Sequence, residues 1–263
     1  MTRVEMKMSG EQFTEIITSL SAVVHETRIT ANHKGLFVCS VDTANVVMVE
    51  LNLAKSYFEK YVYDNSDEGN ADETKPFVFG IDLYLHKSVL PVKKTDLIEW
   101  VYEAQGDGLS QITINGRRVY TFKSDDVTSF RKSPTVKCDD VVTLKNVVEI
   151  EAKALNDFVV SACKISDKTG FSFNATAGVL LKSKGDKGEV SETLDYDSVV
   201  SLETKHSLVS LDYLKEITRA MKGYRKILLR FDEDHPVCLT KEFLGQDAGS
   251  YLTYLLAPRI EAD

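Results

Sequence analysis

Residues 4–20, VEMKMSGEQFTEIITSL, hold the pattern from which the fold can be worked out. The first five alternate between apolar and polar side chains, which is the period of a strand with one buried face. Ser9 is a residue type that caps helix N-termini, and apolar residues then recur at the spacing of one helix face. These are Phe13, Ile16, Ile17 and Leu20. The stretch therefore predicts a strand that leads directly into an amphipathic helix.

The elements that follow this helix recur, in the same order, in the second half of the chain. After the first helix, strands are expected at Arg28–Ala31 and Leu36–Val41, around a turn at Asn32–Gly35. The second half offers a strand at Val148–Ala152, a helix at Leu155–Ile165, and strands at Phe171–Asn174 and Val179–Lys182. Gly178 takes the place in the second copy that Gly35 has in the first. This recurrence indicates an internal duplication.

The repeat extends to the rest of each half. A short helix is expected at Ile81–Leu90 and its counterpart at Leu211–Met221. Each precedes three strand-like runs, at Leu97–Glu103, Gln111–Asn115 and Val119–Lys123, and then at Lys226–Phe231, Val237–Phe243 and Tyr251–Leu256. Each half is mostly strand with two helices. The predicted fold class is therefore α+β, with two duplicated domains that carry helices on one face of long antiparallel sheets.

A polar segment separates the two halves and sets the expected domain boundaries. Residues 126–145 mix charged residues with Ser and Pro134, which is typical of a connector. One domain is expected over residues 1–125 and the other over 146–263. A second segment, Asn65–Thr74, is too charged to pack and predicts an exposed acidic loop, or a tolerated surface insertion without function.

The composition is that of a soluble globular protein, with 43% hydrophobic and 27% charged residues among 263. No apolar run approaches the roughly 20 residues of a bilayer span, and the N-terminus lacks a signal-peptide pattern, so the cytoplasm, or a nucleus, is expected. The net charge of −8 argues against a conventional DNA-binding protein, which concentrates Lys and Arg on a docking face. The four cysteines form no CxxC pair, so buried or inert thiols are expected: Cys39, Cys138, Cys163 and Cys238.

No set of residues predicts an enzyme, a metal site or a cofactor. The run Asp232–His235 has carboxylates that could bind Mg²⁺ in a nuclease, but its place between two strand patterns before Pro236 favours a hairpin turn. The run Ser183–Gly188 lacks the order of a phosphate-binding loop. The histidines at 25, 33, 86 and 206 have no short-range metal spacing. A metal-dependent nuclease therefore stays only as a distant alternative.

Three segments together resemble the proliferating cell nuclear antigen family, the sliding clamps of archaea and eukaryotes. Residues 35–46, GLFVCSVDTANV, are similar to a strand and turn of the family. Leu211–Lys215 resembles its fourth inner helix, and Tyr254–Glu261, YLLAPRIE, resembles its terminal signature. The resemblance covers essentially the whole chain. It departs at Asn45, where eukaryotic members usually have His, and in a connector that looks longer than theirs.

The resemblance implies a ring of three chains, joined head to tail, with helices lining the hole and sheets outside. A ring holds DNA topologically, so the acidic net charge is no obstacle. The family's subunits join through edge strands, which correspond here to Gln111–Asn115 with Val119–Lys123 in one chain and Gly178–Lys182 in its neighbour. The implied interface residues are Gln111, Ile112, Ile114, Gly178, Val179, Leu180 and Leu181.

The resemblance also implies a pocket for short peptides of DNA polymerase, the clamp loader, ligase and nucleases. Such a pocket receives one aliphatic and two aromatic anchors. Its implied lining is Val41, Asn45, Val46, Val127, Phe130, Pro236, Leu255, Leu256, Ala257 and Pro258, with Val127 and Phe130 as lid contacts from the connector. The alternative is that these residues are only core and terminal strand.

Duplex DNA, encircled without sequence preference, is the other implied partner. Basic residues of the inner helices are expected to face it, through water or loosely: Lys87, Lys164, Lys168, Lys215, Arg219 and Lys222. The first helix departs from the family, since Thr14, Glu15, Thr18 and Ser21 stand where lysines are often found. The chain is expected to be a homotrimeric clamp that is not an enzyme, with a subunit of a checkpoint-type hetero-ring as the alternative.

Overall fold

The computed structural model describes residues 2–65, 76–89, 92–104, 108–123, 128, 130–132, 134, 146–174, 178–186, 188–199, 206–243 and 249–260. The chain forms two compact units. Unit 1 comprises Met1–Ser40, Glu50–Pro134 and Glu242–Tyr251, and unit 2 comprises Val41–Val49, Thr135–Lys241 and Leu252–Asp263. Each unit thus includes a short segment from the other half of the sequence. Most of the connector 126–145 and of the acidic loop 65–74 lies outside the described residues.

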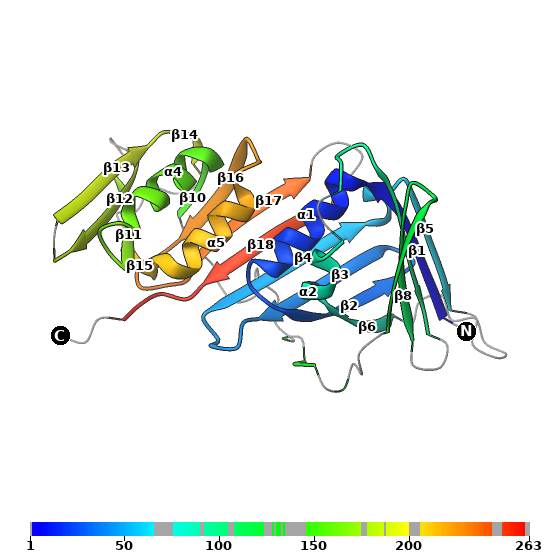
Figure 1. The fold of residues 1–263 in the computed structure, drawn as a ribbon. Coiled ribbons are helices and arrows are strands. Elements are labelled where there is room, and N and C mark those ends of the chain that lie inside the picture. Colours follow the sequence, from blue (N-terminus) through cyan, green and yellow to red (C-terminus); the bar gives the residue numbers. More distant parts are fainter. Residues whose placement is uncertain are drawn as a thin grey trace. The chain divides into compact units, whose positions relative to one another are not determined.

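The same order of elements occurs twice along the chain, which confirms the predicted duplication (Figure 1). The first copy contains β1 Thr2–Ser9, α1 Gly10–Ser21, β2 Glu26–Asn32, β3 Gly35–Val41, β4 Val47–Ala54, η1 Lys55–Tyr57, β5 Lys60–Asn65, β6 Phe77–Asp82, α2 Leu83–Lys87, β7 Leu97–Glu103, β8 Leu109–Ile114 and β9 Arg118–Lys123. The second contains β10 Asn146–Glu151, α4 Ala152–Ala162, β11 Lys168–Asn174, β12 Gly178–Gly185, β13 Gly188–Leu194, β14 Tyr196–Val199, β15 His206–Ser210, α5 Leu211–Met221, β16 Lys226–Phe231, β17 Val237–Phe243 and β18 Ser250–Leu256.

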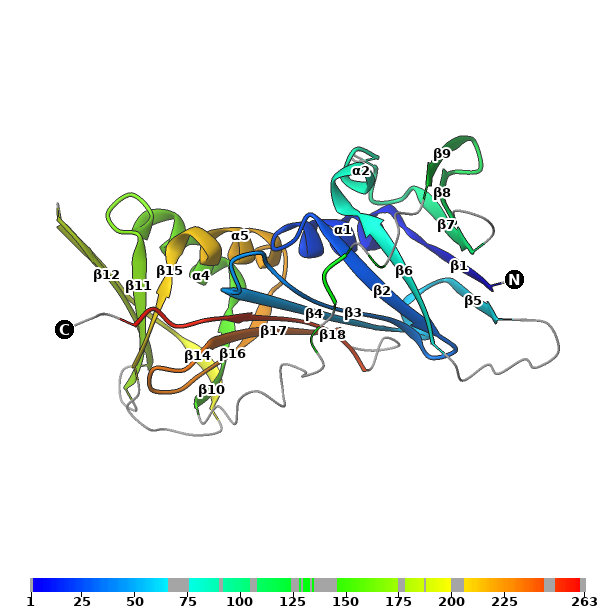
Figure 2. The ribbon, with the colours of Figure 1, turned by 90° about the horizontal axis from the view of Figure 1, so that it is seen from below.

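Each unit consists of antiparallel sheets with helices on one face (Figure 2). Unit 1 has the strand orders β5-β1-β7-β8-β9 and β4-β3-β2-β6, and α1 packs beside α2. Unit 2 has the orders β14-β10-β16-β17-β18 and β13-β12-β11-β15, and α4 packs beside α5. The predicted α+β class with helices on one face is confirmed.

The first helix forms as its sequence predicts. The Ser9 hydroxyl accepts the Gln12 N–H at 3.2 Å, and the Gln12 side-chain oxygen accepts the Ser9 N–H at 2.9 Å, so both ends of a capping box are present. The four apolar residues of the predicted face are all buried. Phe13 meets Trp100 of β7 edge to face, with ring centroids 5.9 Å apart.

Two helices differ from their predicted bounds. The helix predicted over Leu155–Ile165 is α4, which begins at Ala152 and ends at Ala162. Ala152 is apolar and buried, so it fits a strand alternation as well as the first turn of a helix. The helix predicted over Ile81–Leu90 is the shorter α2, because the Asp82 carboxylate accepts the N–H groups of Tyr84 and Leu85 and fixes the helix start after residue 82.

Two of the strands that were predicted to be interface edges are not edge strands of their sheets. β8, which carries Gln111, Ile112 and Ile114, pairs with both β7 and β9. β12, which carries Gly178, Val179, Leu180 and Leu181, pairs with both β11 and β13. Among the described strands, the edges are β5 and β9 in the first sheet and β13 and β15 in the second. The prediction included β9 as Val119–Lys123 and missed β13. β13 was missed because its sequence, GEVSETL, is polar and almost fully exposed and gives no clear alternation.

Candidate functional site

One carboxylate organises the loop between β3 and β4. The buried Asp42 side chain accepts the backbone N–H groups of Ala44 at 3.1 Å and of Val46 and Val47 at 2.7 Å each. The Asp42 N–H donates to the Val47 carbonyl at 2.9 Å, which closes the loop. Asn45 adopts a φ of 60°, a left-handed conformation that Asn tolerates better than most residues. The loop is therefore held in one shape by local bonds.

Helix α5 braces this loop through a tyrosine. Tyr213, in the first turn of α5, is a hydrogen-bond partner of the Asp42 carboxylate. Burial, the negative charge of Asp42 and this bond together raise the pKa of the Tyr213 hydroxyl. Sequence reasoning missed both roles, although an Asp followed at short range by Ala, Asn and Val is a recognisable signal for a side chain that caps its own loop.

The segment after β18 is held at two points within unit 2. The Ala257 N–H donates to the Val46 carbonyl at 2.8 Å, and the Arg259 N–H donates to the Leu208 carbonyl at 2.6 Å. The Arg259 guanidinium also pairs with the Asp167 carboxylate at 2.6 Å and holds the pKa of that carboxyl below its usual range. Pro258 lies half-buried between these two anchors.

Six of the predicted pocket residues gather on this part of unit 2. The Val46–Ala257 bond joins the loop to the terminal segment, and Pro236 precedes β17, whose start lies opposite the end of the neighbouring antiparallel strand β18. All six side chains are half-buried or exposed and can take part in a contact surface: Val41, Asn45, Val46, Pro236, Ala257 and Pro258.

Three predicted contacts are not surface residues. Leu256 is 1% exposed and Leu255 is 8% exposed, so both pack in the core of β18 and present little apolar surface. Phe130 was expected to be an exposed lid, but it is only 6% exposed and belongs to unit 1. A Cβ added to Gly80 of β6 would lie 2.5 Å from its ring, and its carbonyl accepts Arg28 Nη2 at 2.5 Å. Val127 lies outside the described residues.

The predicted DNA-facing residues do not all lie on helices. Lys87 lies on α2, and Lys215 and Arg219 lie on α5; all three are exposed. Lys222 is the C-cap of α5 and is exposed. The placement of the other two on a helix is wrong, because α4 ends at Ala162. Lys164 follows in a turn and Lys168 is the first residue of β11.

The acidic run that suggested a nuclease is a turn with structural bonds. The Asp234 N–H donates to the His206 carbonyl at 3.0 Å, and the Glu233 carboxylate accepts the His206 N–H at 3.0 Å. The part of the chain that the structure describes holds no group of three or more His, Cys, Asp or Glu side chains arranged to hold a metal ion. Nor does any helix of that part have the length and apolar character that crossing a bilayer requires.

Comparison with known proteins gives full-length similarities. The DNA polymerase sliding clamp of Methanosphaerula palustris is 30% identical over 97% of this chain and 98% of its own length, and that of Methanocorpusculum labreanum is 31% identical with the same coverage. The solved structure of the C-terminal region of FEN-1 bound to A. fulgidus PCNA has a TM-score of 0.79 and 26% identity, and the match covers 99% of this chain and all of that one. No protein-family model matches.

Proposed function

Because the chain belongs to the DNA polymerase sliding clamp family, we propose that three copies close head to tail into a ring around duplex DNA. The clamp function itself, that of tethering replication proteins, is confirmed at the level of the family. The trimer rests on the duplication: two clamp units per chain and three chains give the six units of a closed ring. Head-to-tail contacts must close in this way or they extend into filaments.

The internal duplication supports a specific pair of joining strands. Inside unit 2, the end of β18, the last strand of the second copy, lies beside the start of β4, the fourth strand of the first copy. β9 is the last strand of the first copy and β13 is the fourth strand of the second copy. These two strands are therefore the equivalent of β18 and β4 with the copies exchanged. Among the described strands, both lie at an edge of their sheet, and an unpaired edge favours pairing with another chain. Edge pairing of β9 with the β13 of a neighbouring chain would continue the pattern already present within one chain.

The side chains of the two edges suit each other. β9 carries Arg118 and Lys123, whereas β13 carries Glu189 and Glu192. Opposite charges on facing strands favour the correct pairing and disfavour pairing of like edges. Since surface ion pairs are screened by salt, the association should weaken as ionic strength rises.

The surface formed by the Asp42 loop and the terminal segment is the proposed peptide site. The comparison structure that holds the C-terminal region of FEN-1 supports partner binding through a short segment. Half-buried apolar side chains beside anchored backbone are suited to aromatic and aliphatic anchors. We assign the side chains of Val41, Val46, Pro236 and Pro258 to this site, with polymerase, clamp loader, ligase and nuclease peptides as ligands.

The exposed basic residues of α2 and α5 are the proposed contacts to DNA. With a net charge of −8 and few such residues, attraction to DNA is weak, and retention is topological. We propose that the chain is a binding platform that catalyses no reaction, and that it acts in the cytoplasm. A checkpoint-type hetero-ring remains the second candidate, which would need paralogous chains to complete the ring.

Light scattering and calorimetry on the purified protein test this proposal. We expect the mass of three chains, and binding of a peptide that carries Gln, an aliphatic residue and two aromatics. A monomer that forms a ring only with other chains would favour the checkpoint-type alternative. A trimer that binds no such peptide would remove the peptide site but leave the ring. DNA cleavage in Mg²⁺ would contradict the platform role.

A further inference from the structure

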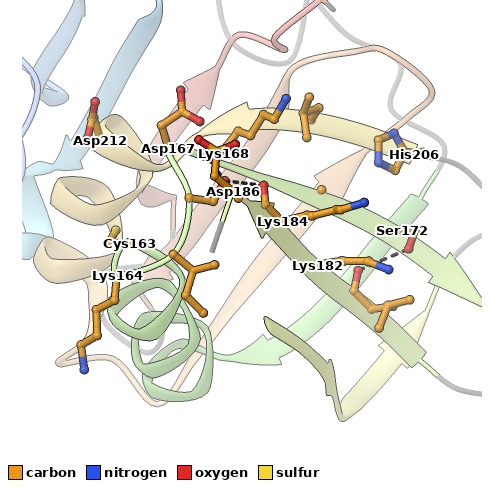
Figure 3. A pocket seen from close by; sticks show the side chains of 16 residues that line it. Cys163, Lys164, Asp167, Lys168, Ser172, Lys182, Lys184, Asp186, His206 and Asp212 are labelled. Carbon is orange, nitrogen blue, oxygen red and sulfur yellow. Dashed lines mark hydrogen bonds between the residues drawn. The ribbon is translucent and has the colours of Figure 1, made fainter. Parts of the chain in front are cut away.

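A cavity of about 1000 Å³ lies in unit 2, on one face of the sheet β13-β12-β11-β15 (Figure 3). Its floor consists of residues on the strand face opposite to the buried Phe171 and Leu181. These floor residues are Gly170, Ser172, Leu180, Lys182, His206 and Leu208. None of the four side chains assigned to the peptide site lines it, so the cavity is a separate feature, although Asp167 and Leu208, which hold Arg259, belong to its lining.

The cavity is shaped by two glycines. A Cβ on Gly170 would lie 2.7 Å from His206 Nε2, so only glycine lets the imidazole lie over this strand. A Cβ on Gly185 would lie 2.0 Å from the Ile165 carbonyl oxygen, so the turn after α4 packs directly against the end of β12. The Ser166 hydroxyl, which donates to the Lys184 carbonyl at 3.0 Å, fixes this wall.

The charge of the cavity differs from that of the chain. Four lysines line it, Lys164, Lys168, Lys182 and Lys184, although the chain as a whole is acidic. Figure 3 shows the ends of the Lys182 and Lys184 side chains on the same side as His206 and Ser172, away from Asp212. Of the three lining carboxylates, that of Asp167 is already paired with Arg259. Glu189 of β13 stands opposite Lys184, and its carboxylate lies 3.1 Å from Lys182 Nζ. Lys182 and Lys184 stand on one strand face beside the half-buried Leu180 and Leu208.

The duplication shows how the equivalent face of unit 1 is used. Counted back from the residue before each second helix, Gly80 of β6 corresponds to Leu208 of β15. Gly80 pairs with Arg28 as Leu208 pairs with Gly170. In unit 1 this place is covered by a connector residue of the same chain, Phe130. Its ring lies over Gly80, and its carbonyl accepts a hydrogen bond from Arg28. In unit 2, none of the connector residues that the structure describes lines the cavity; Leu208 lines it at this place, and the His206 ring lies over the paired Gly170.

We propose that this cavity is a second peptide-docking site, for a partner segment in which an aromatic or aliphatic residue is flanked by Asp or Glu. The apolar residue would lie beside the His206 ring, against Leu180 and Leu208, on the sheet face equivalent to the one that Phe130 covers in unit 1. One flanking carboxylate would meet Lys184, and the other would take the place of Glu189 beside Lys182, an exchange that the exposure of this ion pair allows. Asp186 and Asp212 at the rim disfavour a continuous phosphate backbone, so a peptide with separate charges suits the cavity better than a nucleic acid.

Fluorescence anisotropy with the full chain tests the site. The probe is a labelled Asp-Glu-Phe-Glu-Asp peptide, compared with Lys-Lys-Phe-Lys-Lys and with a single-stranded oligonucleotide of similar charge. The variant Lys182→Glu/Lys184→Glu should bind the acidic probe at least tenfold more weakly than the wild type. The control Lys34→Glu/Lys55→Glu makes the same charge change at exposed positions of unit 1 and should bind as the wild type does.

Amide hydrogen exchange on the wild type gives an independent readout, in case the charge-reversed variant is destabilised. The acidic probe should slow exchange in residues 180–184 and 206–208. The site assignment is overturned if the wild type does not bind the acidic probe at millimolar concentration, if both double variants lose binding equally, or if protection appears elsewhere. Tighter binding of the oligonucleotide than of the peptide would overturn the assignment to a peptide.

Discussion

The substitution Asp42→Ala should disrupt the loop that carries half of the proposed peptide site. It removes the acceptor of three backbone N–H groups, and the Val47 group is buried, with its residue 1% exposed. A buried donor left without a partner costs about 1–3 kcal/mol. The Ala44 and Val46 N–H groups can turn to water and add about 1 kcal/mol together. The expected loss of unfolding free energy is therefore roughly 2–4 kcal/mol.

Urea unfolding followed by circular dichroism, at one fixed protein concentration, measures this loss, because stability of an oligomer depends on concentration. Calorimetry with the peptide of Gln, aliphatic and paired aromatic residues should show weaker binding by the same variant. Asp42→Asn is the matched control: its amide oxygen still accepts hydrogen bonds, so it should lose less on both measures. If Asp42→Ala kept the stability and affinity of the wild type, the loop would not depend on this carboxylate and our account of it would be refuted.

Three other predictions concern the edge strand β13, the buried Phe130 and the ion pair between Asp167 and Arg259. Adjacent residues of an edge strand point their N–H groups in opposite directions, so only one of Ser191 and Glu192 can donate to a neighbouring chain. Proline at that position removes the donor, and one of the variants Ser191→Pro and Glu192→Pro should therefore be monomeric in light scattering. If both variants are trimers, β13 is not the interface. Phe130→Ala should lower the unfolding free energy by about 3 kcal/mol, because it removes a buried ring, and proteolysis should cut the connector faster; unchanged cleavage would place the ring elsewhere. The Arg259 guanidinium lowers the pKa of the Asp167 carboxyl. The ion pair therefore stabilises the folded protein at pH values above the usual carboxyl pKa, and this stabilisation is lost as the pH falls through the lowered pKa. Hydrogen exchange of the Arg259 backbone amide should become faster only at such acidic pH.

The repeated elements could be predicted because their signals are local. Ser9, Gln12 and four apolar residues at helical spacing fix α1 within one stretch of chain, and the same pattern of strand and helix returns after residue 146. The duplication then predicted the fold class without any knowledge of long-range contacts. The apolar pattern does not locate the helix starts, because Ala152 suits both periods and Asp82 acts through a cap that this pattern does not reveal.

The errors concern contacts between distant residues. The order of strands in a sheet depends on pairing between distant parts of the chain, so the sequence did not show that β13 pairs with β12 and takes its place at the edge of the sheet. Phe130 stands in a polar connector and looks exposed there; its burial depends on Gly80, fifty residues away, which leaves room for the ring. Leu255 and Leu256 match the family's terminal signature but both are core residues. A resemblance locates a site, whereas burial decides which of its side chains can meet a ligand.

Retention on circular DNA distinguishes a ring that encircles DNA from a protein that binds its surface. The protein, labelled and loaded by a clamp loader onto a nicked circle, is passed through a sizing column at the highest salt concentration at which light scattering still shows a trimer, because salt weakens any binding that depends on phosphate contacts. We predict that it elutes with the circle and is released when a single restriction cut makes the DNA linear. Release from the intact circle under the same conditions, or equal retention on the cut DNA, would contradict a closed ring that holds DNA by encircling it.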